Sequence, residues 1–235
     1  MQLQTVSSAP SVAFPPMAMC QGMERQAATR IAAVSIRQTI APGQELFAEG
    51  DAAENVYEVV SGMVKLYKLL PDGRRQIMGF ISPGHLIGLV HRGAYVYTAE
   101  AITEVTLCRY PLARFTRLID EVPGFAKRLL DVHSDELSAA HDQMLLLGRK
   151  TAVEKVASFL LMMAEGQHED CDDVYVPMTR TDIADYLGLT IETVSRTLTK
   201  LKAEGVIGRR GADCITVQDR DRLDTLAAGE ALETL

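Results

Sequence analysis

Glu192, Ser195 and Arg196 bring three hydrogen-bonding side chains together within five residues of the chain. Arginine can donate two hydrogen bonds to O6 and N7 of guanine, glutamate can accept one from N4 of cytosine, and serine can donate or accept. On a helix, Glu192 and Arg196 are neighbours one turn apart. The trio could therefore read a short base step in the major groove of DNA. The alternative is an ordinary surface helix with one ion pair.

The residues around this trio carry the signals that start and stop helices. Thr179 and Asp182 have the spacing of a capping box, in which a hydroxyl and a carboxylate bind the free N–H groups of a first helical turn. Gly188 can adopt the positive φ that ends a helix, and Thr190 is suited to cap the next one. The pattern predicts two short helices joined by a tight turn, with the trio on the second helix.

A β-hairpin is expected directly after these helices. Residues 206–211 and 215–217 are two short β-forming runs, and a hairpin there would form the wing of a winged helix-turn-helix. Hydroxyl and cationic side chains on the helices and the wing are candidates for contacts with the DNA backbone: Thr179, Arg180, Thr190, Thr193, Thr199, Lys200 and Arg209.

The charge of the chain is distributed unevenly. The 235 residues carry a formal net charge of −7, which is unusual for a DNA-binding protein. Residues 189–212 nevertheless carry +3, which leaves −10 for the remainder. Positive charge is thus concentrated on the proposed DNA-binding face, where phosphates would lie.

The segment from about Val176 to Val217 resembles the C-terminal domain of the CRP/FNR superfamily of bacterial regulators. The matching residues are those at 187–190 and 192–196, and two further stretches, 59–65 and 73–80, resemble the sensory domain of that superfamily. The resemblance implies that Glu192, Ser195 and Arg196 read the TTGA half of an FNR-type palindrome. It also implies two partners, double-stranded DNA and RNA polymerase.

The rest of the chain fits an α+β protein with separate functional parts. From Ser35 to Pro111, short β-rich runs alternate with turn signals, which is typical of a β-sandwich or roll. We expect an N-terminal arm at 1–34, with a short helix within 21–33. We also expect a cupin-like double-sheet β-roll at 35–112, a dimerisation helix at 113–147 and a winged helix-turn-helix domain at 148–235, whose first helix covers 148–164.

A heptad seam marks the predicted dimerisation helix. Its members recur at spacings of three and four residues: Leu130, His133, Leu137, Ala140, Met144 and Leu147. A homodimer would place two recognition helices about 34 Å apart, which matches a palindromic operator. The alternative is a stripe that packs on the protein's own β-roll. Within the seam, we interpret His133 as a residue that sets the register.

Composition and spacing also bound the compartment and the chemistry. The four cysteines are widely spaced, as expected in a reducing cytosol, and neither a signal peptide nor a membrane-spanning run is recognisable. His168 and Cys171 lie in an acidic stretch, but no complete metal-ligand set accompanies them. No catalytic constellation or phosphate-binding glycine loop is found. The sequence therefore predicts a cytoplasmic regulator without a metal site and not an enzyme.

The effector is the point that the sequence leaves open. An iron–sulfur cluster needs several grouped cysteines, whereas the N-terminal arm has only Cys20. The cyclic-nucleotide branch of the superfamily that this chain resembles carries a glutamate where Leu89 stands and an arginine near Tyr95, which would bind the ribose and the phosphate. Haem would have to bind through His85 or His91. The remaining resemblance is to the FixK-like branch, for which we expect no cofactor and a role in low-oxygen metabolism. The alternative is a regulator gated by a small molecule or haem in the β-roll.

Overall fold

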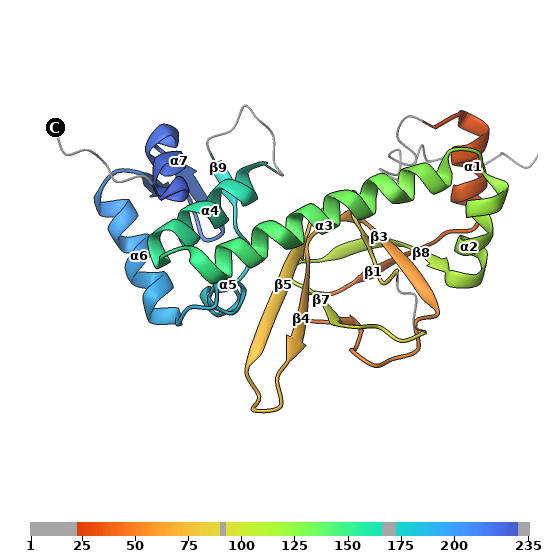
Figure 1. Ribbon diagram of the computed structural model, residues 1–235, viewed down its shortest axis with the longest axis horizontal. Helices are drawn as coiled ribbons and strands as arrows, with labels where there is room; N and C mark the ends of the chain where they lie inside the picture. Colours follow the sequence, from red (N-terminus) through yellow and green to blue (C-terminus); the bar gives the residue numbers. More distant parts are fainter. Residues whose placement is uncertain (1–22, 90–92, 166–172, 230–235) are drawn as a thin grey trace, which may run out of the picture.

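The computed structural model describes residues 23–89, 93–165 and 173–229 (Figure 1). One long helix, α3 (Phe125–Arg149), connects a β-roll, which lies below it in Figure 1, with a helical domain around its C-terminal end. This arrangement confirms the predicted α+β fold with a β-roll, a long helix and a C-terminal winged helix-turn-helix.

The β-roll consists of two four-stranded antiparallel sheets. One sheet has the order β1-β8-β3-β6 and the other the order β2-β7-β4-β5. The strands are β1 (Ile36–Ile40), β2 (Glu45–Phe47), β3 (Asn55–Ser61), β4 (Val64–Leu69), β5 (Arg75–Ile81), β6 (Leu86–Ile87), β7 (Thr98–Ala101) and β8 (Val105–Pro111). Alternate side chains point between the sheets, so that residues such as Val59, Val64 and Leu107 form the core of the roll.

The outer face of strand β4 is also buried. Val64 and Leu66 point into the roll, whereas Tyr67, on the opposite face, joins a second core cluster together with Ile77 of β5. That second cluster includes Phe159 and Leu187 of the helical domain. The sheet β2-β7-β4-β5 is therefore covered on both faces, once by its own roll and once by the C-terminal domain.

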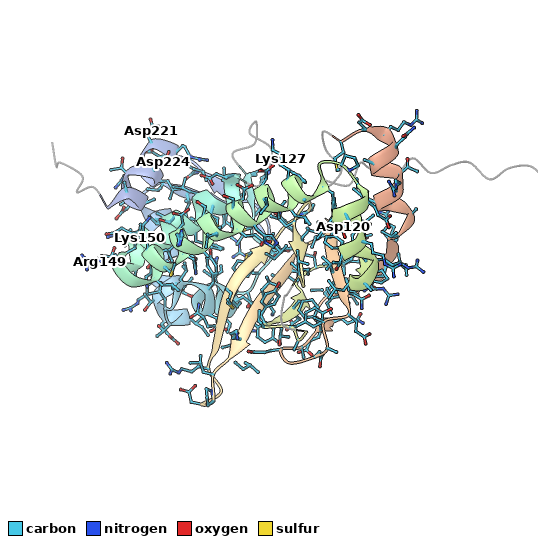
Figure 2. The ribbon with its side chains drawn as sticks, turned by 45° about the vertical axis from the view of Figure 1, so that its right-hand side comes forward. Asp120, Lys127, Arg149, Lys150, Asp221 and Asp224 are labelled. Atoms are coloured by element: carbon cyan, nitrogen blue, oxygen red, sulfur yellow. The ribbon has the colours of Figure 1, made fainter. Side chains whose placement is uncertain are left out.

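Three helices flank the roll. Helix α1 (Arg25–Ala33) lies within the predicted range, and α2 (Leu112–Glu121) directly follows β8. The chain then turns at Gly124, which has a φ of 82°, and enters α3. At 25 residues, α3 is about 37 Å long. Lys127 and Arg149 mark its two ends in Figure 2.

The C-terminal domain surrounds a three-stranded sheet of order β10-β11-β9. Its elements are α4 (Ala152–Glu165), β9 (Asp173–Tyr175), α5 (Arg180–Leu187), α6 (Ile191–Ala203), β10 (Ile207–Arg209), β11 (Cys214–Val217) and α7 (Arg220–Ala228). The sequence analysis did not predict β9 or α7.

The range predicted for the dimerisation helix, 113–147, contains two helices, α2 and α3, and its C-terminal boundary was also wrong. Gly148 and Arg149 belong to α3 and not to the first helix of the C-terminal domain. The break comes at Lys150, which is extended, with a φ of −84° and a ψ of 144°. The Glu154 carboxylate accepts a hydrogen bond from the backbone N–H of Thr151, which starts α4 at Ala152.

No described helix combines the length and the apolar character needed to cross a bilayer.

Candidate DNA-binding interface

Helix α5 begins at the predicted capping box. The Thr179 hydroxyl accepts a hydrogen bond from the backbone N–H of Asp182 at 3.1 Å, and the Asp182 carboxylate accepts one from the backbone N–H of Thr179 at 3.2 Å. Each side chain thereby satisfies a donor that the first turn leaves free. The start of α5 is therefore determined locally, as the sequence predicted.

The turn between α5 and α6 also forms as predicted. Gly188 ends α5 in the left-handed conformation, with a φ of 60° and a ψ of 42°. Thr190 then caps α6, because its hydroxyl accepts a hydrogen bond from the backbone N–H of Thr193 at 3.2 Å. Three residues, Gly188, Leu189 and Thr190, thus separate the helices, which matches the turn of a helix-turn-helix.

The outward face of α6 presents the candidate base-reading trio. Glu192, Ser195 and Arg196 are all exposed, while the inward face, formed by Val194, Leu198 and Leu201, is buried. Hydrogen bonds from its own backbone N–H and from the Thr190 hydroxyl lower the pKa of Glu192, with a smaller effect from Arg196. The carboxylate is therefore ionised at neutral pH and can accept hydrogen bonds.

The candidate backbone contacts on α6 lie along both sides of the trio. Thr190 and Thr193 are at the helix start, where their hydroxyls are 3.1 Å apart. Thr199 and Lys200 are exposed in the second half, where the Thr199 hydroxyl donates to the carbonyl of Ser195. The helix therefore offers polar groups from its first turn to its last.

A concave pocket of about 330 Å³ lies between the start of α5 and the wing, and its lining includes Thr179, Arg180 and Arg209. The Arg209 guanidinium donates to the carbonyls of Gly211 and Ala212, which hold it in the wing turn. Burial lowers the pKa of Arg180, and the nearby charge of Arg209 lowers it further. The pocket lining thus contains two cations and one acid, Asp213, and the net positive charge beside a helix N-terminus favours an anion.

The wing is supported by a strand that the sequence analysis missed. Strand β9 pairs with β11, and Asp173 at its start forms an ion pair with Arg210 at 2.7 Å and accepts a hydrogen bond from Thr216. Arg210 was counted only as part of the positive charge of this region. In the structure, it anchors the wing to β9. Asp173 was the only sequence signal for this ion pair, but its partner Arg210 lies 37 residues away in the chain.

The predicted seam lies on the exposed surface of α3. Leu130, Leu137 and Met144 are 70%, 58% and 61% exposed, and His133 and Ala140 are also exposed. His133 contacts Glu136 at 3.1 Å. Leu147 differs, because it is partly buried against the core of its own C-terminal domain. Leu145, which was not part of the predicted seam, is 56% exposed. Apolar side chains exposed along one helix are typical of a protein-protein interface.

Aromatic side chains pack tightly inside the β-roll. Phe47 and Tyr95 stack with their ring centroids 3.7 Å apart, and Tyr57 and Tyr97 pack against Phe47. The Tyr95 hydroxyl donates to the carbonyl of Asn55 at 2.8 Å. A Cβ atom at Gly88 would lie 3.0 Å from the Tyr95 ring. The Tyr95 and Phe47 rings therefore lie directly against Gly88, which precedes Leu89.

The other residues considered for metal or haem binding are either solvent-exposed or outside the described part of the chain. No group of three or more metal-ligating side chains occurs among the described residues. His85 is exposed, and its Nδ1 contacts the carbonyl of Ser82 in a turn. Cys20, His91, His168 and Cys171 lie outside the described residues.

Comparison with protein families assigns both parts of the chain. Residues 154–226 match the Crp-like helix-turn-helix domain. Residues 37–122 match the cyclic nucleotide-binding domain. The first match contains α5, α6 and the wing, and the second contains the β-roll except for Ile36 at the start of β1.

Individual relatives cover most of the chain. The nitrogen fixation regulation protein FixK of Bradyrhizobium diazoefficiens is 43% identical over 214 residues, which is 90% of each chain. The transcriptional activatory protein AadR of Rhodopseudomonas palustris is 47% identical over 193 residues, which is 80% of this chain and 79% of AadR. The solved structure of FixK2 from Bradyrhizobium japonicum matches with a TM-score of 0.78 and 40% identity, and the match covers 86% of this chain and all of FixK2.

Proposed function

The chain belongs to the CRP/FNR superfamily of transcriptional regulators, in its FixK-like branch, and from this premise we propose that it binds a TTGA-N6-TCAA palindrome as a homodimer. As a member of this superfamily, it is a DNA-binding regulator and not an enzyme. The operator, the dimer, the effector and the physiological role are the parts that we propose.

The observation that carries the proposal is the exposed trio Glu192, Ser195 and Arg196 on a capped recognition helix. Arg196 reads guanine through O6 and N7, Glu192 accepts from N4 of cytosine, and Ser195 contacts an adjacent base. The GA step of TTGA and its complement present these groups. The hydroxyls and cations beside the trio, at 190, 193, 199 and 200, contact the phosphates and set the register of the helix.

The wing pocket holds a further phosphate. Thr179, Arg180 and Arg209 line it, and the N-terminus of α5 lies beside it. A phosphate there separates the mutually unfavourable charges of the two guanidinium groups and also interacts with the positive end of the helix dipole. This contact is independent of base sequence.

The exposed surface of α3 forms the dimer. The centres of TTGA and TCAA lie about 10 base pairs apart, which is about 34 Å along the DNA. A twofold axis along α3 can present the two recognition helices on one side of the DNA at this spacing. Leu130, Leu137 and Met144 then lose their exposure to solvent.

Operator binding requires no small-molecule effector. The stacked rings of Phe47 and Tyr95 fill the interior of the roll beside Gly88. A buried phosphate needs a cationic partner, and Tyr95 and Val96 stand where the cyclic-nucleotide branch carries its arginine. A ligand would have to displace the rings and bring its own countercharge.

Regulation then depends on the amount of protein in the cytoplasm. On this proposal, the bound dimer contacts RNA polymerase and activates genes of low-oxygen metabolism. Two relatives carry matching descriptions, since AadR is called a transcriptional activatory protein and FixK a nitrogen fixation regulator.

A mobility-shift titration tests operator binding. Purified protein without added ligand should shift a TTGA-N6-TCAA duplex at low salt, whereas a duplex with both half-sites scrambled should bind about a thousandfold or more weakly. If only haem or a cyclic nucleotide restored the shift, the effector-free proposal would be wrong and the β-roll would be a receptor.

Leu137→Glu tests the dimer. The charge should disrupt an apolar seam, so that sedimentation reports monomers and operator binding is lost. Leu69→Glu is the matched control, because Leu69 is 62% exposed on β4 and outside the seam. Equal association of both variants would exclude α3 as the interface.

A further inference from the structure

Helix α5, the first helix of the helix-turn-helix, is held at both ends by side chains from outside that motif. Residues of the β-roll contact its first half, and residues of the roll, α3 and α4 contact its last turn. The contacts from the roll and from α3 cross the extended residue Lys150, where the C-terminal domain is joined to α3, whereas the Lys155 contact lies within the C-terminal domain. We refer to the contacts that cross Lys150 as the α5 clamp, which comprises Lys65, Arg75, Gln76 and Gln143 with their partners on α5.

The first half of the clamp is a network of ion pairs. Arg75 of β5 donates to Asp182 at 2.7 Å and to Asp185 at 2.8 Å. Lys65 of β4 lies 3.1 Å from Asp182 and 2.9 Å from Glu100 of β7. The side chains of Lys65 and Asp182 are only 9% and 6% exposed. The charges therefore lie in a poorly hydrated interface, where each depends on its partners.

The two carboxylate oxygens of Asp182 have different roles at the start of α5. Its Oδ2 atom accepts from Thr179 in the capping box, while its Oδ1 atom faces Lys65 and Arg75. Burial alone would raise the pKa of Asp182, but the Thr179 hydroxyl and Lys65 hold it below its usual value. The carboxylate that starts α5 thus also attaches α5 to the β-roll.

The last turn of α5 is held through its free carbonyl groups. The carbonyl of Tyr186 accepts from Gln143 of α3 at 3.0 Å and from Gln76 of β5 at 3.4 Å. The carbonyl of Leu187 accepts from the buried amino group of Lys155 at 3.1 Å. A cation at this position also compensates the negative end of the helix dipole.

Apolar contacts complete the interface but are less directional. Phe80 of β5 packs against Phe159 and Tyr186, with ring centroids 6.0 and 5.1 Å apart. Such contacts favour association of the two domains without selecting one orientation, whereas the forked hydrogen bonds of Arg75 require a defined geometry.

We infer that the α5 clamp determines the distance and rotation between the two recognition helices, which makes Arg75 and Asp185 positioning residues for operator spacing. The inference rests on the proposed function, because it assumes a dimer with α3 at its axis. Since α6 follows α5 after three residues, an orientation fixed for α5 is passed directly to the trio. Without the clamp, each C-terminal domain turns about Lys150 and accepts other spacings.

Spacer selectivity is the measurement that tests the clamp. Inserting or removing one base pair moves the half-sites about 3.4 Å apart or together and rotates them by about 34°. Full-length protein is titrated with duplexes that carry N5, N6 and N7 spacers, together with an N6 duplex in which the guanine of each half-site is replaced. The wild-type protein should prefer N6 over N5 and N7 by about tenfold or more.

Arg75→Ala and Asp185→Ala should reduce that preference to about threefold or less. Both should retain the preference for the guanine, because the trio itself is unchanged. Arg74→Ala is the matched control, since Arg74 pairs only locally with Asp72 and is 75% exposed. If Arg75→Ala does not fold, Asp185→Ala alone tests the clamp. This variant should fold, because alanine favours helix more than aspartate does.

The outcomes separate the clamp from the proposed function. A wild-type protein that does not distinguish the guanine would overturn base reading and not the clamp. The clamp would be overturned if a guanine-selective wild-type protein showed no spacer preference. It would also be overturned if both clamp variants kept the wild-type spacer preference.

Hydrogen exchange of the DNA-free protein tests the clamp without an operator. Amides of α5 should exchange faster in both clamp variants than in Arg74→Ala, and equal rates would also overturn it.

Discussion

The two helices of the helix-turn-helix both carry charged side chains, but these charges have different surroundings. On α6, Glu192 and Arg196 are exposed to solvent. On α5, Asp182 and Asp185 form ion pairs with Arg75 of the β-roll. Exposed groups keep hydrogen-bonding capacity for a partner such as DNA, whereas compensated groups hold the motif in place. Exposure and pairing therefore distinguish the proposed recognition residues of α6 from the proposed positioning residues of α5.

The difference has energetic consequences. An exposed ion pair contributes only about 0–1 kcal/mol to stability, so that residues of α6 can be changed at little cost to folding. Removal of one partner from a buried pair costs about 3–5 kcal/mol, because a charge is left without compensation. Substitutions on α5 should thus affect the free energy of unfolding, while those on α6 should affect DNA affinity.

Asp182→Ala should have the largest effect. It removes the capping box of α5 and leaves Lys65 and Arg75 without a shared partner, so that the free energy of unfolding should fall by about 3–5 kcal/mol. Urea denaturation at fixed protein concentration measures the change. Asp221→Ala is the control, because Asp221 is an exposed acid in the first turn of α7 (Figure 2).

The effect of Asp182→Ala on the free energy of unfolding should depend on pH. The pKa of Asp182 is lowered in the folded protein, so its stabilising effect is present above the ordinary value of 3.8 and is lost as the pH falls further. The difference in unfolding free energy between wild type and Asp182→Ala should thus be constant near pH 6 and decrease below about pH 4. A difference that stayed constant down to pH 3 would contradict the ion-pair network with Lys65 and Arg75.

Arg196→Ala should have the next largest effect, and only on DNA binding. Loss of the two hydrogen bonds to guanine should cost about 1–3 kcal/mol of operator affinity and remove selectivity at that position. Competition titrations with all four bases at the guanine measure both quantities. Lys202→Ala, another exposed cation of α6, should leave the selectivity intact. Equal losses on operator and random DNA would show that Arg196 does not read a base.

Lys200→Ala and Arg209→Ala should have the smallest effects. If each side chain binds a phosphate, its removal should weaken all sequences equally and lower the slope of log affinity against log salt by about 1. Titrations at several salt concentrations measure the slope. Lys127→Ala, at the far end of α3, should leave it unchanged (Figure 2). A base-dependent effect of Lys200→Ala would assign it to recognition instead.

Local signals explain which parts could be predicted from the sequence. The capping box at Thr179, the left-handed Gly188 and the cap at Thr190 act within a few residues, so the helix-turn-helix was predicted correctly. Strand β9 was missed because three residues carry little pattern, and its pairing with β11 joins positions about forty residues apart. The boundary at Gly148 was wrong because glycine does not by itself end a helix.

The candidate recognition residues were accessible to sequence analysis, whereas the clamp was not. Glu192 and Arg196 are recognisable because bases require particular donors and acceptors at helical spacing. Arg75, in contrast, lies in a stretch that was matched only to the sensory domain, and its partner Asp185 is 110 residues away. No short-range pattern connects the two.

The amino-acid sequence alone determined the type of each element and the chemistry that the recognition helix offers, because caps, turns and helical periodicity depend on neighbours within one or two turns. The tertiary structure decided which of these charges are compensated. It brought β4 and β5 against α5, enclosed Asp182 between two cations and left Glu192 and Arg196 in solvent. Burial depends on residues distant in the chain, and burial determines whether a charge holds the fold together or remains available for a partner.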